Sequence, residues 1–164
     1  MPTYHHGSLR SAILESAARM VEKEGTGGLS VREAARRAGV SHNAPYRHFR
    51  DRDALLNALA VDGVARLLKD LGTTSGRELA EAYVRFSLAR PQLFRLMFAG
   101  RRWPEIEARF AEAFADVGRP GAAAAWALVH GLACLILDGN IERDEAVWTR
   151  VIGAMRFAVA QRSA

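Results

Sequence analysis

Polar side chains of the types that bind nucleic acids cluster in one short stretch of this sequence. His42, Asn43, Arg47 and His48 lie within seven consecutive residues. Side chains of these types donate hydrogen bonds to base edges and to phosphate oxygens, and arginine also attracts a polyanion by its charge. We therefore expect this stretch to recognise a polyanion through hydrogen bonds.

Capping and turn signals predict the elements that position these side chains. Ser30 suits a helix N-cap, and Glu33 three residues later completes the capping-box pattern, in which its carboxylate reaches back to the Ser30 amide. Gly39 suits the positive φ that commonly follows a helix, and Ser41 is a second N-cap type. The sequence thus predicts two helices, over 30–38 and 42–49, joined by a turn of about three residues, which is a helix-turn-helix.

The second of these helices is short and polar. Only Tyr46 and Phe49 are large and apolar, and we expect Phe49 to anchor the helix to the one before it. Pro45 restrains Ala44, so we expect an irregular first turn. In a helix-turn-helix the second helix enters the DNA major groove.

These residues resemble the DNA-binding domain of the TetR family of bacterial transcriptional regulators. The resemblance rests on Leu29 to Ser41, on residues 45–49 and on residues 51–56, and it extends over roughly residues 8–60. The opening residues 4–10, together with Trp126 and His130-Gly131, resemble a subgroup whose C-terminal domain carries a Trp, His and Gly signature.

The resemblance implies a homodimer that binds a roughly palindromic operator in double-stranded DNA, usually as a repressor. It implies that His42, Asn43 and Ala44 face bases and that Arg32 reaches a guanine. It further implies that Arg47 contacts either a base or a phosphate. The residues that it implies contact phosphates are Ser30, Tyr46, His48 and Arg52.

The distribution of charge favours the same end of the chain. The 164 residues carry a net charge of +5, and the sequence pI is near 10.1. Residues 1–52 hold nine Lys or Arg against five Asp or Glu, whereas residues 53–164 hold fourteen against thirteen. The positive excess therefore lies with the predicted helix-turn-helix, which suits a polyanionic partner.

Other features limit the remaining function classes. The single Cys134 excludes an intramolecular disulfide, and no N-terminal segment has the apolar core of a signal peptide, so we expect a cytoplasmic protein. The longest apolar run, 122–137, is short for a bilayer span, and we expect a buried helix and no membrane partner. No Gly-rich phosphate loop, nucleophile elbow or placed carboxylate pair is evident, so we expect no enzyme activity and no cofactor.

Hydrophobic periodicity and breaker residues predict an all-α fold of about nine helices. We expect a DNA-binding domain over 1–51, a connecting helix over 52–71 and a regulatory and dimerisation domain over 72–164. The predicted helices are 8–24, 30–38, 42–49, 52–71, 75–89, 91–99, 104–117, 122–138 and 143–162.

The expected C-terminal domain is rich in aromatic and apolar side chains. These suit a pocket for a small apolar or amphipathic effector, although aromatics at helical spacing equally suit a plain core. The candidate pocket residues are Phe94, Phe98, Trp103, Phe110, Phe114, Trp126 and His130. Wide apolar faces on the last two helices also predict a four-helix dimer interface. The candidate interface residues are Ala127, Gly131, Trp148, Ile152, Met155 and Val159.

Two alternatives stay open. His130, Cys134 and Asp138 are spaced four residues apart and so share one helix face, where they form a possible metal site and hence a metal-responsive regulator. No second cluster completes the ligand set, and we expect no metal. The other alternative is a DNA-binding or interaction protein without any ligand, whose pocket is replaced by a solid core.

Overall fold

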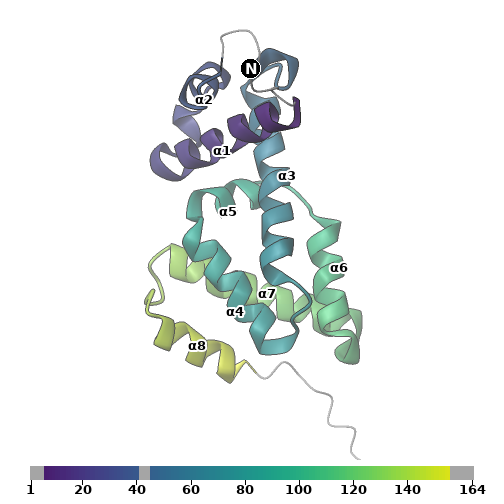
Figure 1. Cartoon of the computed structure of the whole chain (residues 1–164). Helices are drawn as coiled ribbons and strands as arrows, with labels where there is room; N and C mark the ends of the chain where they lie inside the picture. Colours follow the sequence, from purple (N-terminus) through teal and green to yellow (C-terminus); the bar gives the residue numbers. More distant parts are fainter. Residues whose placement is uncertain (1–5, 41–44, 156–164) are drawn as a thin grey trace, which may run out of the picture. The chain divides into compact units, whose positions relative to one another are not determined.

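The computed structural model describes residues 6–40 and 45–155, and all regular structure in these ranges is helical (Figure 1). This confirms the predicted all-α fold. The α-helices are α1 His6–Glu24, α2 Val31–Arg37, α3 Arg52–Leu71, α4 Gly76–Ala89, α5 Pro91–Phe98, α6 Pro104–Ala113, α7 Gly118–Leu137 and α8 Glu145–Ala154. Three short 3₁₀ helices accompany them, η1 Thr26–Gly28, η2 Pro45–Arg47 and η3 Ala115–Val117.

The chain forms two compact units. The head unit comprises residues 1–64 and 90–101, and the C-terminal unit comprises residues 65–89 and 102–164. The first division falls inside α3, and α5 belongs to the same unit as the helix-turn-helix. These units follow packing partners rather than sequence order, and the functional boundaries after residues 51 and 71 stay a prediction.

The core of the head unit forms where α1 packs against α2. Ile13, Ala17 and Met20 recur at helical spacing on α1 and are almost fully buried. On α2 the buried residues facing them include Ala34 and Ala35, whose small side chains let the two helices approach closely. The expected amphipathic character of both helices is confirmed.

Helix α2 begins and ends as its sequence predicts. The Ser30 side chain accepts a hydrogen bond from the amide of Glu33 at 3.1 Å. Gly39 has φ of 71°, and the amide of Val40 donates to the carbonyl of Ala35 at 3.0 Å. This is the Schellman arrangement, which satisfies carbonyls at the end of a helix and turns the chain sharply.

The carboxylate of Glu33 has partners other than the expected Ser30 amide. It accepts hydrogen bonds from Arg36 at 2.8 Å and from Arg37 at 2.7 Å. Arg37 also donates to Glu24 at the end of α1, so this ion-pair network joins the two helices. The hydrogen bonds from Arg36 and Arg37 lower the pKa of Glu33 to about 2.

The stretch after the turn is anchored by Phe49. The amides of His48 and Phe49 both donate to the carbonyl of Pro45 at 2.9 Å, and the first of these bonds, from three residues on, is of the 3₁₀ type found in η2. Phe49 is 1% exposed, and the Arg10 guanidinium lies 5.5 Å from its ring centroid. Phe49 is thus buried, as an anchor would be, but its anchoring to the helix before it stays a prediction. The first part of the predicted helix, residues 42–44, lies outside the described residues.

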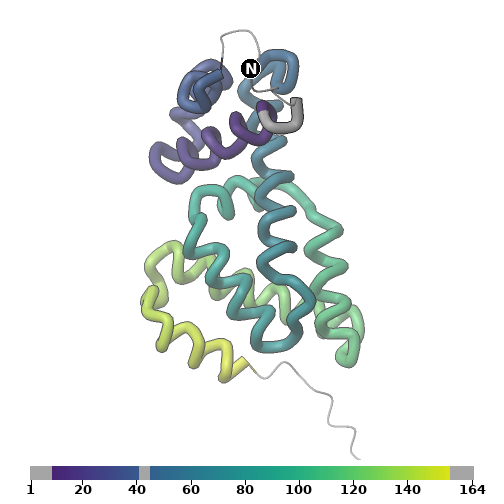
Figure 2. The backbone as a smooth tube through the Cα atoms, viewed as in Figure 1, coloured from purple at the N-terminus to yellow at the C-terminus, as the bar shows by residue number. Residues whose placement is uncertain are grey.

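Helix α5 joins the head unit through two contacts. The carboxylate of Glu22 on α1 accepts hydrogen bonds from the amides of Gln92 at 3.2 Å and Leu93 at 2.8 Å, 70 and 71 residues further along the chain. These amides lie in the first turn of α5, where helical partners are lacking. A Cβ on Gly63 of α3 would lie 2.8 Å from the sulfur of Met97, so glycine permits α3 and α5 to touch. Figure 2 follows the chain from α1 to this distant segment.

The C-terminal unit is built around α7, which packs against α4 and α6 (Figure 1). Helix α8 in turn packs against α4. The largest buried side chains come from three of these helices, with Tyr83 on α4, Phe110 on α6 and Trp148 on α8 each exposed by 2% or less. Arg109 on α6 adds a polar tie, since its guanidinium donates to the carbonyls of Gly72 and Thr74.

Helix α7 is more apolar than its packing within this chain requires. The segment Ala115–Leu137 is long and apolar enough to cross a membrane by length and composition, with a mean hydropathy of 1.7, yet only 33% of it is buried. It begins at Gly118, four residues before the predicted start at 122, because Pro120 is tolerated in a first helical turn. One face of α7 packs in the core, and the opposite face carries exposed Leu128 and Leu135.

The pKa of Glu33 gives a testable dependence of stability on pH. Because this pKa is lowered from 4.5 to about 2, the carboxylate stabilises the fold fully above about pH 4.5, and this contribution is lost as the pH falls through about 2. We expect the free energy of unfolding to be lower for Glu33→Gln than for wild type at about pH 7, and the difference to shrink below about pH 4.5. Urea titrations across this range measure it, with Glu142→Gln, an exposed glutamate, as control. A difference that grows as the pH falls contradicts the prediction.

Replacing Glu22 tests how α5 is held. Glu22→Ala leaves the amides of Gln92 and Leu93 without their acceptor, and we expect a loss of about 1 kcal/mol, as for other helix caps. Hydrogen exchange at these two amides is expected to accelerate before exchange elsewhere in α5. Glu22→Gln, which keeps an oxygen acceptor, is expected to show a smaller effect, and unchanged exchange in Glu22→Ala would contradict the capping role.

Candidate nucleic-acid interface and ligand pocket

The helix-turn-helix presents several predicted contact residues at its surface. Arg32 and Arg47 are exposed, Tyr46 is 51% exposed although aromatic, and His48 is half-buried. Ser30 is exposed, but its hydroxyl oxygen already caps α2. The predicted base-reading residues His42, Asn43 and Ala44 lie outside the described residues.

Arg52 has a different environment from the other predicted phosphate contacts. Its guanidinium donates to the carbonyl of Thr26 at 2.6 Å and to that of Leu29 at 3.2 Å. These bonds tie the loop before α2 to the start of α3. The side chain remains 44% exposed. The guanidinium that we expected to contact a phosphate therefore also holds this loop in place.

The arginines of α2 and η2 differ in how far their charge is already paired. Arg36 and Arg37 share the carboxylate of Glu33, whereas Arg32 and Arg47 form no ion pair with any residue in 6–40 or 45–155. A shallow hollow of about 230 Å³ lies against α2, lined by Ser30, Arg32, Glu33, Ala35, Arg36 and Val40. Arg32 and Arg47 are therefore the guanidinium groups best able to attract a polyanion at this surface.

A chain of polar groups crosses the C-terminal unit. The hydroxyl of Tyr83 lies 2.9 Å from Nδ1 of His130, and Nε1 of Trp126 donates to the same hydroxyl at 3.4 Å. The Sγ of Cys134 lies 3.6 Å from Nε2 of His130. Burial raises the pKa of Tyr83 and lowers that of His130, so both are neutral near pH 7.

This arrangement bears on the metal alternative. Both ring nitrogens of His130 face other side chains, Tyr83 on one side and Cys134 on the other. No group of three or more His, Cys, Asp or Glu side chains in the described ranges is placed to hold a metal ion. His130 and Cys134 lie on α7 and Asp138 follows its last residue, and the three do not form such a group.

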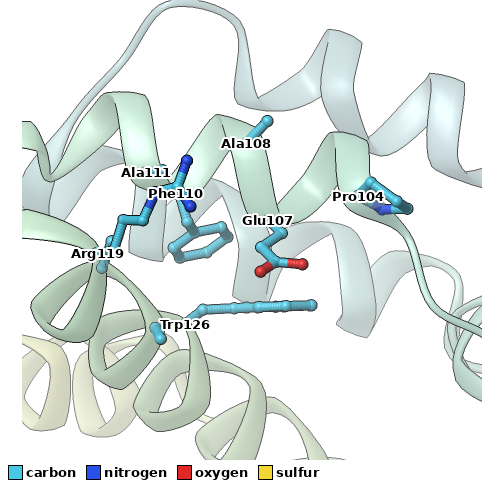
Figure 3. Close-up of a pocket in the computed structure, with 9 residues that line it drawn as sticks. Pro104, Glu107, Ala108, Phe110, Ala111, Arg119 and Trp126 are labelled. Carbon is cyan, nitrogen blue, oxygen red and sulfur yellow. The ribbon is translucent and has the colours of Figure 1, made fainter.

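A pocket of about 240 Å³ opens between α6 and α7. Its apolar wall includes the rings of Phe110 and Trp126, whose centroids lie 6.0 Å apart. Arg119 and Pro104 lie at opposite ends, with Glu107 between them (Figure 3). Four alanines leave the space open because their side chains do not reach across the two helices, namely Ala108, Ala111, Ala122 and Ala123.

The pocket differs from the set of aromatic residues that the sequence suggested. Only Phe110 and Trp126 of that set line it. Phe94 and Phe98 pack on each other in α5, which belongs to the head unit. Phe114 is buried in a stack against Phe110, His130 bonds to Tyr83, and Trp103 precedes α6 without lining the pocket. The alanines carry no sequence signal for a pocket, which is why they were missed.

The expected dimer residues also separate into two groups. Trp148 and Ile152 are 2% and 1% exposed within the single chain, and the Arg85 guanidinium lies 5.6 Å from the Trp148 ring centroid. Both side chains are therefore already covered by their own chain, and their part in a dimer interface stays a prediction. Ala127 is exposed, and Gly131 and Met155 are half-buried, while Val159 lies outside the described residues.

Two family models match this chain, one over its N-terminal part and one over its C-terminal part. Residues 13–59 match the family model of bacterial regulatory proteins of the TetR family. Residues 77–162 match the tetracyclin repressor-like C-terminal domain.

Individual relatives agree with these matches. An HTH-type transcriptional regulator of Mycobacterium tuberculosis is 28% identical over 93% of this chain, which spans 56% of that relative's length. An HTH-type transcriptional repressor of the same species is 32% identical over 68% of this chain and 65% of its own. A solved structure of a protein of unknown function from Rhodococcus sp. RHA1 superposes with a TM-score of 0.72 at 37% identity, covering 94% of each chain. This protein belongs to the TetR family of bacterial regulatory proteins.

Proposed function

We propose that this protein is a transcriptional repressor that binds a palindromic operator as a homodimer and releases it when a small effector binds the C-terminal unit. The observation that carries the proposal is the helix-turn-helix, in which a capped α2 ends in a sharp glycine turn. Phe49 anchors the segment that follows, so exposed Tyr46 and Arg47 are held at the surface. Binding to chromosomal DNA would place the protein in the bacterial cytoplasm.

Within this proposal the residues divide by task. His42, Asn43 and Ala44 read bases in the major groove, and Arg32 reaches a guanine. Ser30, Tyr46, His48 and Arg52 fix the register on the backbone, and Arg47 contacts either a base or a phosphate. Two recognition helices of a dimer would meet half-sites about one helical turn apart, roughly 34–36 Å. Repression is supported by the relative named as a repressor.

Binding to the DNA upstream of the protein's own gene tests the proposal. We expect sequence-selective binding measured by fluorescence anisotropy over a series of salt concentrations. Asn43→Ala is expected to lose about 1–3 kcal/mol of discrimination between operator and unrelated DNA. Arg47→Ala, if it removes a phosphate contact, is expected to lower the salt dependence by about one ion without changing selectivity.

Arg150→Ala supplies the matched control, because Arg150 is an exposed arginine of α8 whose guanidinium donates to the carbonyl of Ala146 in the same helix. It is expected to bind operator like wild type. If wild type binds every DNA equally and moderate salt abolishes this binding, the protein has only a basic surface and the repressor proposal fails.

The homodimer proposal rests on the exposed face of α7. Ala124, Ala127, Leu128, Gly131 and Leu135 lie along this face at helical spacing, and of these Leu128 is 49% and Leu135 45% exposed. A two-fold axis would place the same patch of a second copy against it, so that small residues and leucines of the two copies could interdigitate. The opposite face of α7 packs on α4 and α6, so immersion in a bilayer would require the unit to come apart.

Gly131 supports a second copy as the occupant of this face. A glycine inside a helix costs about 1 kcal/mol relative to alanine. A Cβ at Gly131 would meet no atom of residues 6–40 or 45–155 within 4 Å, so no contact among these residues requires the glycine. Close approach of a partner helix would require it. The Trp-His-Gly subgroup, to which Trp126, His130 and Gly131 would belong, remains part of the proposal.

Substitutions of Gly131 distinguish an α7 face that is open to solvent from one that is covered by a second copy. If α7 faces solvent there, Gly131→Ala is expected to raise stability by about 1 kcal/mol. If α7 pairs with a second copy, Gly131→Leu is expected to shift sedimentation equilibrium toward monomer while circular dichroism stays helical. Gly27→Ala, at another open position, serves as control. A Gly131→Leu protein that associates like wild type would refute this interface.

The pocket between α6 and α7 favours an effector over the ligand-free alternative. A regulator without a ligand has no need of an opening of about 240 Å³ lined by two aromatic rings. The protein must have one arrangement that fits the operator and another that does not. An effector releases DNA only if its affinity for the second arrangement is higher than its affinity for the first.

A further inference from the structure

We propose that the pocket between α6 and α7 takes a small planar aromatic molecule carrying a carboxylate, with its ring on Trp126 and its carboxylate on Arg119. This inference rests on the proposed function, because it names the chemical class of the effector. It depends on three properties of the pocket: its size, its flat apolar wall and the balance of charge at its rim.

The size of the pocket limits the ligand. Sites for drug-sized ligands usually occupy about 300–1,000 Å³. This pocket offers about 240 Å³. The alanines on α6 and α7 set its width, so the space admits one or two fused rings but not a large multi-ring ligand.

The wall of the pocket favours a planar ligand. Phe110 is 1% exposed and stacks between Phe114, at 6.1 Å and 11°, and Trp126, at 6.0 Å and 29°. Trp126 is half-buried, and its N–H is used by the hydroxyl of Tyr83, which fixes the indole plane. In Figure 3 this ring lies edge-on across the pocket, below Phe110 and Glu107. Aromatic ligands gain from offset stacking on such a rigid ring.

The charges at the rim favour an anion. Glu107, 60% exposed, already has the Arg102 guanidinium 3.7 Å away. Arg119 is exposed and forms no ion pair with any residue of the part that the structure describes. The guanidinium with no partner therefore selects a carboxylate, which it can bind through two parallel hydrogen bonds. A cationic ligand would instead compete with Arg102 for Glu107 and meet Arg119 as a like charge.

Three probes of nearly equal shape test the charge preference: benzoate, benzamide and benzamidinium. Binding is followed by tryptophan fluorescence and by calorimetry with the full chain, and Trp126→Phe assigns the fluorescence signal. We expect benzoate to bind more tightly than benzamide, and benzamide more tightly than benzamidinium. Losing a charge-assisted pair corresponds to about tenfold in affinity, so Arg119→Gln is expected to bring benzoate down to the level of benzamide.

Two further variants locate the effect at the pocket. Glu107→Gln removes a like charge from the rim and is expected to tighten benzoate binding, and Arg150→Gln, an exposed arginine outside the pocket, is the control expected to leave it unchanged. Circular dichroism of each variant checks the fold. The spectrum of Arg119→Gln is expected to match wild type, because the exposed Arg119 side chain does not stabilise the fold. Benzamidinium binding as tightly as benzoate, equal benzoate binding by Arg119→Gln, or no binding by any probe would each overturn the inference.

Operator binding by the same preparation separates this inference from the proposed function. Operator binding without any benzoate effect overturns the aromatic-carboxylate class and leaves the repressor proposal intact. Benzoate binding through Arg119 in a protein that binds no operator supports the pocket chemistry and overturns the repressor proposal. Benzoate that both binds and weakens operator affinity supports both.

Discussion

The carboxylate of Glu22 on α1 ties the first turn of α5 to the head unit. A helix N-terminus exposes amides without partners, and a carboxylate from α1 satisfies two of them across 70 residues of sequence. Gly63 then lets α3 touch α5 without a clash. The chain leaves the head unit within α3, returns as α5 and leaves again after residue 101.

This routing bears on the ligand response proposed above. A unit joined to the rest of a chain by a single connection can move independently of a conformational change that a ligand causes elsewhere. The backbone passes between the two units three times, at residues 64–65, 89–90 and 101–102, so the proposed ligand response would have three covalent connections through which to act. A ligand uses such routes only to the extent that it binds one arrangement better than the other.

The sequence was sufficient where a structure depends on neighbouring residues. The cap at Ser30 and the turn at Gly39 follow from the side chains at those positions, and both are present as predicted. It was insufficient where several partners compete for one group. Glu33 bonds to two arginines instead of the Ser30 amide. Trp148 has the periodicity of an interface residue, but periodicity does not tell whether an apolar face is covered by its own chain or by a second copy.

The pocket illustrates the same limit. Phe110 and Trp126 could be named from their type, but the space beside them exists because α6 and α7 meet through alanines. Which helices are neighbours is a tertiary property, so the absence of bulk at Ala111 or Ala122 has no meaning until the helices are placed. Arg119 was missed for a related reason, since its segment was expected to be a loop and is instead the first turn of α7.

Helix α7 connects the pocket with the exposed apolar face. Arg119 and Trp126 line the pocket in its first half, while Leu128 and Leu135 lie exposed in its second half. Trp126 also bonds to Tyr83, which bonds to His130 one turn further along α7. If the ligand and a second copy both bind this helix, their binding free energies are linked, and the factor by which ligand changes dimer affinity must equal the factor by which dimerisation changes ligand affinity. The ligand affinity of wild type and of a monomeric α7 variant would therefore differ by that factor, even though the variant residue does not line the pocket.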